Sequence, residues 1–388
     1  MSYRYAVIGA GRQGIAAAYD MAKFGNAESV LLADTNLKLA QAGAKHINQL
    51  LKRNVAKAVR CDVRNKPQTL SVLKGVDSFL SGVPYPFNPV LTDIAIKIKA
   101  NMCDLGGNTA IVRQQLKKDT LARKAGISIV PDCGMGPGLN ISLAVYAMSL
   151  VDNPKEVYIW DGGLPQNPQP PWNYLSTFNI GGLTNEYYGD AYFLRDGKVT
   201  PVPCFEGEEE LDFPPPIGRL EAAVTSGGLS TAPWTFQGKL QRLENKTLRY
   251  PGHWSQFKAF ALLGLLELKP IQVGKIKIVP RDVLHALLEP KITRPHIKDV
   301  CVMRVKCVGA KNGRPAEAML ELIDYYDEIT GFTAMQRLTG WHASIVAILA
   351  ARGAIKRGAV SVESVPGDVI VKEARLRGFE IKEKTVIG

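Results

Sequence analysis

The chain has 388 residues, enough for two or three domains, of which 46% are hydrophobic and 22% charged. This composition excludes a disordered, collagenous or coiled-coil protein. The 48 Lys and Arg residues outnumber the 36 Asp and Glu, and the net charge of +12 could attract nucleic acid, anionic lipid or an anionic cofactor. Because no stripe of basic residues alternates with aromatic ones, we expect no nucleic-acid partner.

The first third of the chain alternates strand patterns with helix patterns. Strands are predicted at 3–8, 30–33, 58–61, 76–80, 102–105 and 127–130, and helices at 12–24, 37–51 and 90–100. This alternation is typical of a parallel sheet that is covered by helices on both faces. We therefore predict an α/β fold whose first domain is a doubly wound parallel sheet.

After Pro131 glycine and proline become dense, and a second domain is predicted to begin. Its predicted elements are a helix at 139–150, a strand at 155–160, exposed connections at 164–172 and 206–216, hairpin strands at 299–308 and 316–326, and a helix at 334–351. In a monomer the hairpin strands would leave an unpaired β edge exposed to solvent. We therefore expect a homodimer.

No segment of the sequence directs the chain to a membrane or out of the cell. No apolar run reaches the ~18 residues of a membrane span, and the residues before Gly9 are too few for a signal peptide. The six cysteines form no CxxC pair, so neither a metal site nor a disulfide framework is predicted. We expect a cytoplasmic protein with no membrane association and no bound metal.

A glycine-rich motif between the first strand and the first helix predicts a dinucleotide site. Its candidate cofactor-binding residues are Gly9, Gly11, Arg12, Gln13 and Gly14. The glycines allow a tight turn, close approach of a pyrophosphate and close helix packing, while the N-terminus of the helix favours phosphate. The second strand ends in Asp34, which can bind both ribose hydroxyls and would repel a 2′-phosphate. NAD is therefore predicted over NADP, although Arg12 could alternatively serve a 2′-phosphate.

Other polar or glycine-rich residues follow predicted strands of the first domain. Ligands of open parallel sheets bind at the carboxyl ends of the strands, which meet at one edge. Further cofactor-binding candidates are Asp62, Val83, Pro84 and Asn108.

Eight segments together resemble the saccharopine dehydrogenase-like superfamily, and most closely its lysine 6-dehydrogenase branch. They are the glycine motif and the runs PYPFN (84–88), DLGGN (104–108), PDCGMGPG (131–138), TSGGLST (225–231), KTLRYPGH (246–253), PRDVL (280–284) and VPGDV (365–369). The resemblance covers essentially the whole chain. It implies an NAD-binding Rossmann-type domain at 1–132, an inserted mixed α/β domain for substrate binding and oligomerisation at 133–333, and a C-terminal helix and tail at 334–388 that return to the first domain.

The activity implied by this resemblance is NAD-dependent oxidative deamination of the ε-amine of L-lysine, or of a close basic amino acid. The product is the 6-semialdehyde, which cyclises to piperideine-6-carboxylate. Saccharopine-type enzymes usually carry an Asp within the segment matching 134–138, where this chain has Gly136, and this favours the lysine branch. Val224 departs from the aromatic or His residue that this branch tends to have before Thr-Ser-Gly-Gly. Two alternatives stay open: reductive condensation, as in saccharopine or carboxynorspermidine formation, and an NAD-binding sensor without catalysis.

Such a reaction requires a base, because a protonated amine with a pKa of ~10.4 must lose a proton before hydride leaves the adjacent carbon. Candidate catalytic residues are His253, Asp104, Tyr85 and Asp132. Arg249 offers a bidentate fork for the substrate carboxylate. The other predicted substrate-binding residues are Thr225, Ser226, Tyr250 and Glu221. Alternatively, the two Asp residues cap buried loops, Arg249 forms a structural ion pair and His253 is structural.

Overall fold

The computed structural model describes residues 1–388 and contains two large sheets and a small hairpin. The first is a seven-stranded parallel sheet in the order β17-β6-β5-β4-β1-β2-β3. Its strands are β1 (Tyr3–Ile8), β2 (Ala27–Asp34), β3 (Ala56–Arg60), β4 (Ser78–Ser81), β5 (Asn101–Asp104), β6 (Ser128–Val130) and β17 (Gly358–Ala359). The predicted fold class is confirmed.

Helices cover both faces of this sheet, as the continuous burial of its central strand requires. In β1, Tyr5 and Val7 pack in one core cluster, and Ala6 and Ile8 pack in another on the opposite face. The first face carries α1 (Arg12–Phe24), α2 (Leu37–Leu51) and α13 (His342–Ala351). The second carries α3 (Lys66–Val72), α4 (Asn88–Ile98), α5 (Thr109–Leu116) and α6 (Asp119–Ala125).

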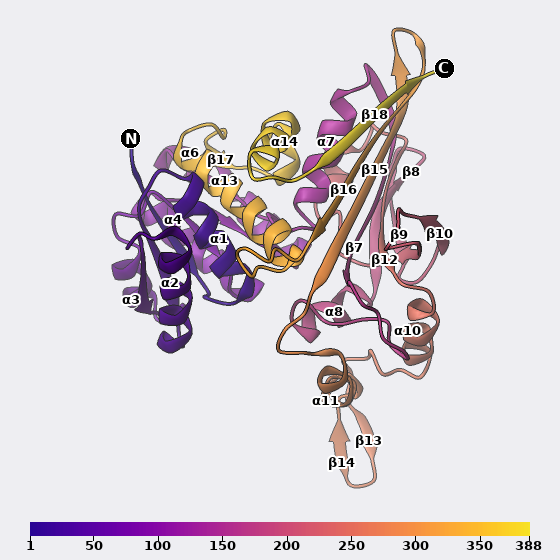
Figure 1. Ribbon diagram of the computed structural model, residues 1–388, viewed down its shortest axis with the longest axis horizontal. Coiled ribbons are helices and arrows are strands. Elements are labelled where there is room, and N and C mark those ends of the chain that lie inside the picture. Colours follow the sequence, from indigo (N-terminus) through magenta and orange to yellow (C-terminus); the bar gives the residue numbers. More distant parts are fainter.

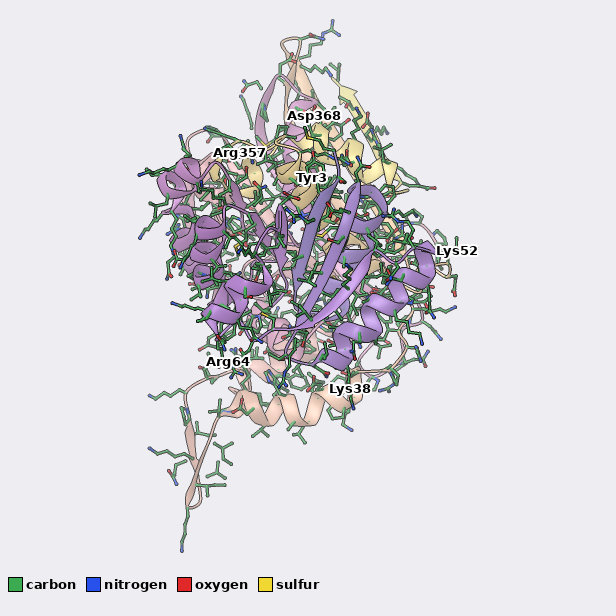
Figure 2. The ribbon with its side chains drawn as sticks, turned by 90° about the vertical axis from the view of Figure 1, so that its left-hand side faces the viewer. Tyr3, Lys38, Lys52, Arg64, Arg357 and Asp368 are labelled. Atoms are coloured by element: carbon green, nitrogen blue, oxygen red, sulfur yellow. The ribbon has the colours of Figure 1, made fainter.

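Figure 2 shows the two ends of the strands of this sheet. Tyr3 lies at the amino end of β1, whereas Lys38 and Arg64, which follow β2 and β3, lie toward the opposite end of the domain. The carboxyl ends of the strands therefore share one edge, and the predicted cofactor residues follow strands at this edge.

The second sheet is mixed, with β7 parallel to β12 and its other pairings antiparallel. Its main order is β10-β11-β12-β7-β15-β16-β18, and β8 and β9 branch from β12. The strands are β7 (Asn153–Pro165), β8 (Asp190–Arg195), β9 (Lys198–Pro203), β10 (Glu209–Asp212), β11 (Arg219–Val224), β12 (Arg242–Arg249), β15 (Asp299–Lys311), β16 (Arg314–Tyr325) and β18 (Ile381–Ile387).

The remaining elements pack around this second sheet or project from it. They are α7 (Leu139–Ser149), α8 (Ile180–Glu186), α9 (Ala232–Phe236), α10 (His253–Leu262), α11 (Pro280–Ile292), α12 (Ala334–Gln336), α14 (Gly367–Leu376) and the hairpin β13 (Ile271–Val273) and β14 (Ile276–Ile278). Helix α7 covers β7, β15 and β16 on the face turned toward the first domain. The β13–β14 hairpin projects away from both sheets (Figure 1). No helix is both long and apolar enough to cross a bilayer.

The C-terminal part differs from the expectation that 334–388 returns as a unit to the first domain. Helix α13 and strand β17 join that domain, but β18 pairs with β16 along the second sheet (Figure 1). The predicted helix at 334–351 is also divided, because a π-helical turn, η2 (Arg337–Trp341), separates α12 from α13. Within η2, Gly340 lies so close to α1 that an added Cβ would be 2.7 Å from the Gln13 carbonyl oxygen.

Two loop-level expectations also change. The stretch 206–216, expected to be a connection, contains strand β10 at the edge of the second sheet. The exposed edge that led us to expect a homodimer is absent from β16, because β18 covers it. A homodimer therefore stays a prediction without that support.

Candidate active site

Two glycines of the loop after β1 are tightly packed against the protein, and a third faces open space. Gly9 has φ of +101°, and a Cβ there would lie 2.6 Å from the Gly82 carbonyl oxygen. A Cβ at Gly14 would lie 2.0 Å from the Gly9 carbonyl oxygen. At Gly11, by contrast, no atom lies within 4 Å of the Cβ position, and the residue is exposed. The open space beside Gly11, at the N-terminus of α1, fits the close approach of a pyrophosphate.

Asp34 ties the end of β2 to this loop. Its Oδ2 accepts a hydrogen bond from the Ala10 amide at 2.8 Å, and its Oδ1 accepts one from the Asn36 amide at 2.8 Å. The residue is only half-buried, so the carboxylate is accessible to a ligand bound at the glycine loop. Arg12 is exposed, and the side-chain oxygen of Gln13 is buried without a hydrogen-bond partner.

The other predicted cofactor residues have different surroundings. Val83, followed by Pro84, lies in the loop after β4, and its amide nitrogen would be 3.3 Å from a Cβ at Gly9. Asp62 pairs with Arg64 at 2.7 Å, and hydrogen bonds from Arg64 lower the pKa of this carboxyl to about 2. Asn108 caps α5, since its Oδ1 accepts from the amides of residues 110 and 111. Val83 and Pro84 thus adjoin the glycine loop, whereas Asp62 and Asn108 already have protein partners.

Asp104 and Asp132 are buried, and their carboxyls form hydrogen bonds that stabilise the loops at this sheet edge. Asp104 Oδ2 accepts from Gln115 Nε2 at 2.7 Å, and its Oδ1 accepts from the Gly106 amide at 2.8 Å. Asp132 Oδ2 accepts from Ser230 Oγ at 2.5 Å. Burial raises the pKa of both carboxyls, and Asp104 further raises that of Asp132. The loop-bracing interpretation therefore fits both residues better than direct catalysis.

The catalytic prediction for His253 is corrected by its burial. The ring is 1% exposed, lies 4.4 Å from the Phe257 ring centroid and shares a hydrogen bond of 2.9 Å with the Tyr187 hydroxyl. Burial and the nearby Arg249 hold its pKa well below the ordinary range. His253 therefore supports an aromatic core beside Arg249 and is absent from the lining of the cavity that contains Arg249. Tyr85, by contrast, is half-buried against Gly107 of the DLGGN loop and stays a catalytic prediction.

A cavity lies between the loop that follows β6 and the α7-covered face of the second sheet. Its lining includes three charged side chains, Asp161 of β7, Glu186 of α8 and Arg249 of β12. The other lining residues are Met135, Gly136, Gly162, Gly163, Phe178, Thr225, Ser226, Gly228, Asn245, Thr247 and Met335. Three of the predicted substrate residues, Thr225, Ser226 and Arg249, thus come together here.

Hydrogen bonds to neighbouring groups of the protein hold the Arg249 side chain in place. It is 3% exposed, its Nε donates to the Tyr187 hydroxyl at 3.0 Å and its Nη1 donates to the Leu248 carbonyl at 2.9 Å. Its Nη2 lies 3.9 Å from Glu186 Oε2, beyond hydrogen-bond distance. The protein therefore engages Nε and Nη1, and Nη2 is the donor that remains for an anionic group in the cavity.

The two cavity carboxyls retain protons at unusually high pH. Burial raises the pKa of Asp161 to about 6, although Asn245, Asn140 and Arg249 oppose the shift. Partial burial raises the pKa of Glu186, whose side chain is 32% exposed, to about 7, with Arg249 lowering it and Asp161 raising it further. Near pH 8 both side chains are ionised, so the cavity wall carries two negative charges and one positive charge.

Tyr250 and Glu221 are corrected, since neither lines this cavity. Alternate residues of a strand point to opposite faces, so Thr247 and Arg249 face the cavity while Leu248 and Tyr250 pack in a core on the other side. Glu221 Oε2 accepts from the Gly252 amide at 3.1 Å, before α10. Both residues have structural roles.

Sequence reasoning missed Asp161, Glu186 and Asn245. A lone carboxylate inside the apolar strand pattern 157–164 is the signal that could have identified Asp161. Glu186 and Asn245 carry no comparable signal, because only the packing of α8 and β12 brings them to the same cavity.

Both parts of the chain match family models of known proteins. Residues 5–130 match the family model for the saccharopine dehydrogenase NADP binding domain, and residues 134–376 match that for the saccharopine dehydrogenase C-terminal domain. A curated relative, the NADP(+)-dependent, L-glutamate-forming saccharopine dehydrogenase of Saccharomyces cerevisiae, is 26% identical over 175 residues. That match spans 44% of this chain and only 39% of the yeast enzyme.

A solved structure shows the same fold. The apo L-Glu-forming saccharopine dehydrogenase from Saccharomyces cerevisiae superposes with a TM-score of 0.79 at 22% sequence identity. The superposition covers 99% of this chain and 100% of the yeast chain.

Proposed function

Because the chain belongs to the saccharopine dehydrogenase family, we propose that it is an NAD(P)-dependent amino-acid dehydrogenase acting on L-lysine or a close basic amino acid. We choose this substrate because of the charged groups in the cavity, which is lined by two carboxyls and one guanidinium. L-lysine carries a net positive charge, which is opposite to the net charge of these three groups when both carboxyls are ionised.

The cofactor proposal rests on the glycine loop and Asp34. Gly11 and the N-terminus of α1 would hold the pyrophosphate, Asp34 the adenosine ribose, and the loop of Val83 and Pro84 would flank them. The bound nicotinamide ring would supply the hydride acceptor. We propose NAD as this cofactor, because the Asp34 carboxylate repels a 2′-phosphate.

The chain's own residues would bind the two ends of the substrate. Arg249 holds the α-carboxylate with Nη2 of its guanidinium, while the ε-amine extends toward the loop after β4, which adjoins the glycine loop. There Tyr85, as the phenolate, would take the proton that the ε-ammonium must lose before oxidation and become the neutral hydroxyl. Asp132 and Asp104 keep the neighbouring loops in place.

Saccharopine-type chemistry is the second candidate, and the yeast relative's activity favours it. Saccharopine carries three carboxylates, whereas the cavity contains a single guanidinium beside two carboxyls. The decisive assay mixes the protein with L-lysine and NAD or NADP and follows the absorbance of reduced cofactor. A parallel assay offers 2-aminoadipate 6-semialdehyde, glutamate and reduced cofactor. Turnover only in the second assay would replace the lysine proposal.

The cavity carboxyls predict a pH dependence of substrate binding. Asp161 and Glu186, with pKa values of about 6 and 7, lose their negative charge as the pH falls, while the amines of lysine stay protonated. The Kd for L-lysine is therefore expected to rise at least about tenfold between pH 8 and pH 5.5. Calorimetric titration at several pH values measures this. An unchanged Kd would show that the carboxyls do not contact the substrate.

Replacing Asp34 by asparagine is expected to change the choice of nucleotide. The ratio of kcat/KM for NADP to that for NAD should rise about tenfold, because the charge that repels a 2′-phosphate is removed. Asp77→Asn is the matched control, since Asp77 Oδ2 also accepts a backbone amide, that of Arg4, but at the amino edge of the sheet. An equal change of the ratio in both variants would contradict the role of Asp34.

A further inference from the structure

Two buried polar atoms on the cavity wall have no well-formed hydrogen bond in the protein. They are Asp161 Oδ2 and Asn245 Nδ2, whose residues are only 5% and 2% exposed. The amides of Asn245 and Asn140 lie close enough to lower the pKa of Asp161 but do not complete such a bond. Buried polar groups in folded proteins are almost always hydrogen-bonded. An unpaired acceptor and an unpaired donor on one cavity therefore indicate a ligand that supplies both a donor and an acceptor.

The strand register places these atoms close to Arg249. Asp161 of β7 pairs with Thr247 of β12, and Asn245 and Arg249 lie two residues to either side of Thr247 on the same face. Neighbouring strands lie about 4.8 Å apart, so a small ligand can contact Asp161 on one strand and Arg249 on the other.

Gly136 leaves the space in front of Asp161 open. A Cβ at this position would lie 3.0 Å from Asp161 Oδ2 and 3.2 Å from Asn140 Nδ2. Gly136 is exposed and lines the cavity, while its neighbours Met135 and Pro137 are buried. Any larger residue at 136 would occupy the place where a ligand can reach the Asp161 carboxylate.

The charges indicate which ligand groups belong there. Glu186 and Asp161 together exceed Arg249 by one negative charge when both are ionised, so a cationic donor is favoured beside Asp161. An anionic acceptor is favoured beside Arg249 and Asn245. An ammonium and a carboxylate on one carbon atom, the zwitterionic end of an α-amino acid, satisfy both requirements.

We propose that Asp161 binds the α-ammonium group of the substrate, while Arg249 and Asn245 bind its α-carboxylate. This assignment rests on the proposed function in that it names the substrate class of the same site. It makes Asp161 the residue that selects α-amino acids over ω-amino acids and simple amines. Glu186 adds negative charge on the same side of the cavity.

Calorimetric titration of the full chain at pH 8 tests this selection with two ligands. L-lysine carries the α-ammonium group, and 6-aminohexanoate lacks it. The wild-type protein is expected to bind L-lysine at least about 30-fold more tightly. Asp161→Asn should weaken L-lysine binding by a similar factor and leave 6-aminohexanoate binding unchanged. Gly136→Ala should also weaken L-lysine binding, because it fills the space before an intact carboxylate.

A melting curve separates this role from a structural one. Asp161→Asn is expected to keep or raise the melting temperature, because burial disfavours a carboxylate with an unpaired oxygen. Asp20→Asn is the control, since Asp20 is equally buried but pairs with Arg377 at 2.8 Å, far from the cavity. This variant should lower the melting temperature and keep the ligand selectivity.

The outcomes distinguish this inference from the proposed function. Wild-type protein that does not bind L-lysine, or Asp161→Asn protein that keeps its preference for L-lysine, would overturn the inference. If the Asp161→Asn protein keeps the preference and the wild-type protein oxidises lysine, the proposed function stands without the inference. If Asp161→Asn loses the preference but no amine is oxidised with either nucleotide, the binding site stands and the proposed reaction fails.

Discussion

Replacing Arg249 by glutamine is expected to lower kcat/KM for L-lysine by about 10³-fold. The guanidinium is 3% exposed and is the cationic side chain on the cavity wall, so the variant leaves the substrate carboxylate without a charged partner. Loss of one member of a buried, hydrogen-bonded charge pair costs about 3–5 kcal/mol, and each 1.4 kcal/mol is a factor of ten. Steady-state kinetics with L-lysine measures this effect.

Two controls separate substrate binding from a general loss of structure. The diamine 1,5-diaminopentane has no carboxylate, so its kcat/KM should change less than about threefold in Arg249→Gln. Arg377→Gln removes another buried arginine, which pairs with Asp20. It should lower the melting temperature but leave the KM for L-lysine unchanged. Equal losses for the diamine and L-lysine would indicate that Arg249 only stabilises the fold around Tyr187 and His253.

Substitutions in the glycine loop are expected to have two different effects. Gly11→Ala should keep the melting temperature of the free protein, because no atom lies within 4 Å of the new Cβ. It should weaken dinucleotide binding at least about tenfold, since the Cβ occupies space required by the pyrophosphate. Gly14→Ala should lower the melting temperature and abolish dinucleotide binding, because its Cβ would lie 2.0 Å from the Gly9 carbonyl oxygen.

Thermal unfolding of the free protein and calorimetry with NAD and NADP measure these effects. The contrast between the two variants is the informative result, since Gly14 is required by the protein and Gly11 by the ligand. If Gly11→Ala bound both nucleotides with wild-type affinity, the loop would be only a tight turn. The proposed cofactor site would then be wrong.

Much of the first domain could be predicted because its signals are local. From Tyr5 to Ile8 the strand is apolar on both sides, which is typical of a sheet covered on both faces, and the structure has β1 at these residues with helices on each face. The glycine motif and Asp34 lie within 26 residues of each other and belong to one strand-helix-strand unit. Asp34 does contact this loop, through the Ala10 amide.

The second domain was less predictable because its elements pair over long distances. Strand β18 covers the edge of β16 about 60 residues earlier in the chain, and no local pattern indicates this pairing. His253 shows the same limitation at the level of a single residue. Its ordinary pKa favours a catalytic role, but burial beside Phe257 and Arg249 changes that pKa and removes the ring from the cavity.

The sequence by itself determined the parallel sheet and the glycine loop, and it made Arg249, Thr225 and Ser226 substrate-binding candidates beside Tyr250 and Glu221. These follow from hydrophobic periodicity and from motifs of a few adjacent residues. Only the tertiary structure decided which faces of β7 and β12 form the cavity. Asp161, Glu186 and Asn245 come from three separate elements, and the register of two strands turns Tyr250 away while it turns Arg249 inward. Strand pairing sets such a register, and strands distant in the chain leave no local pattern of it.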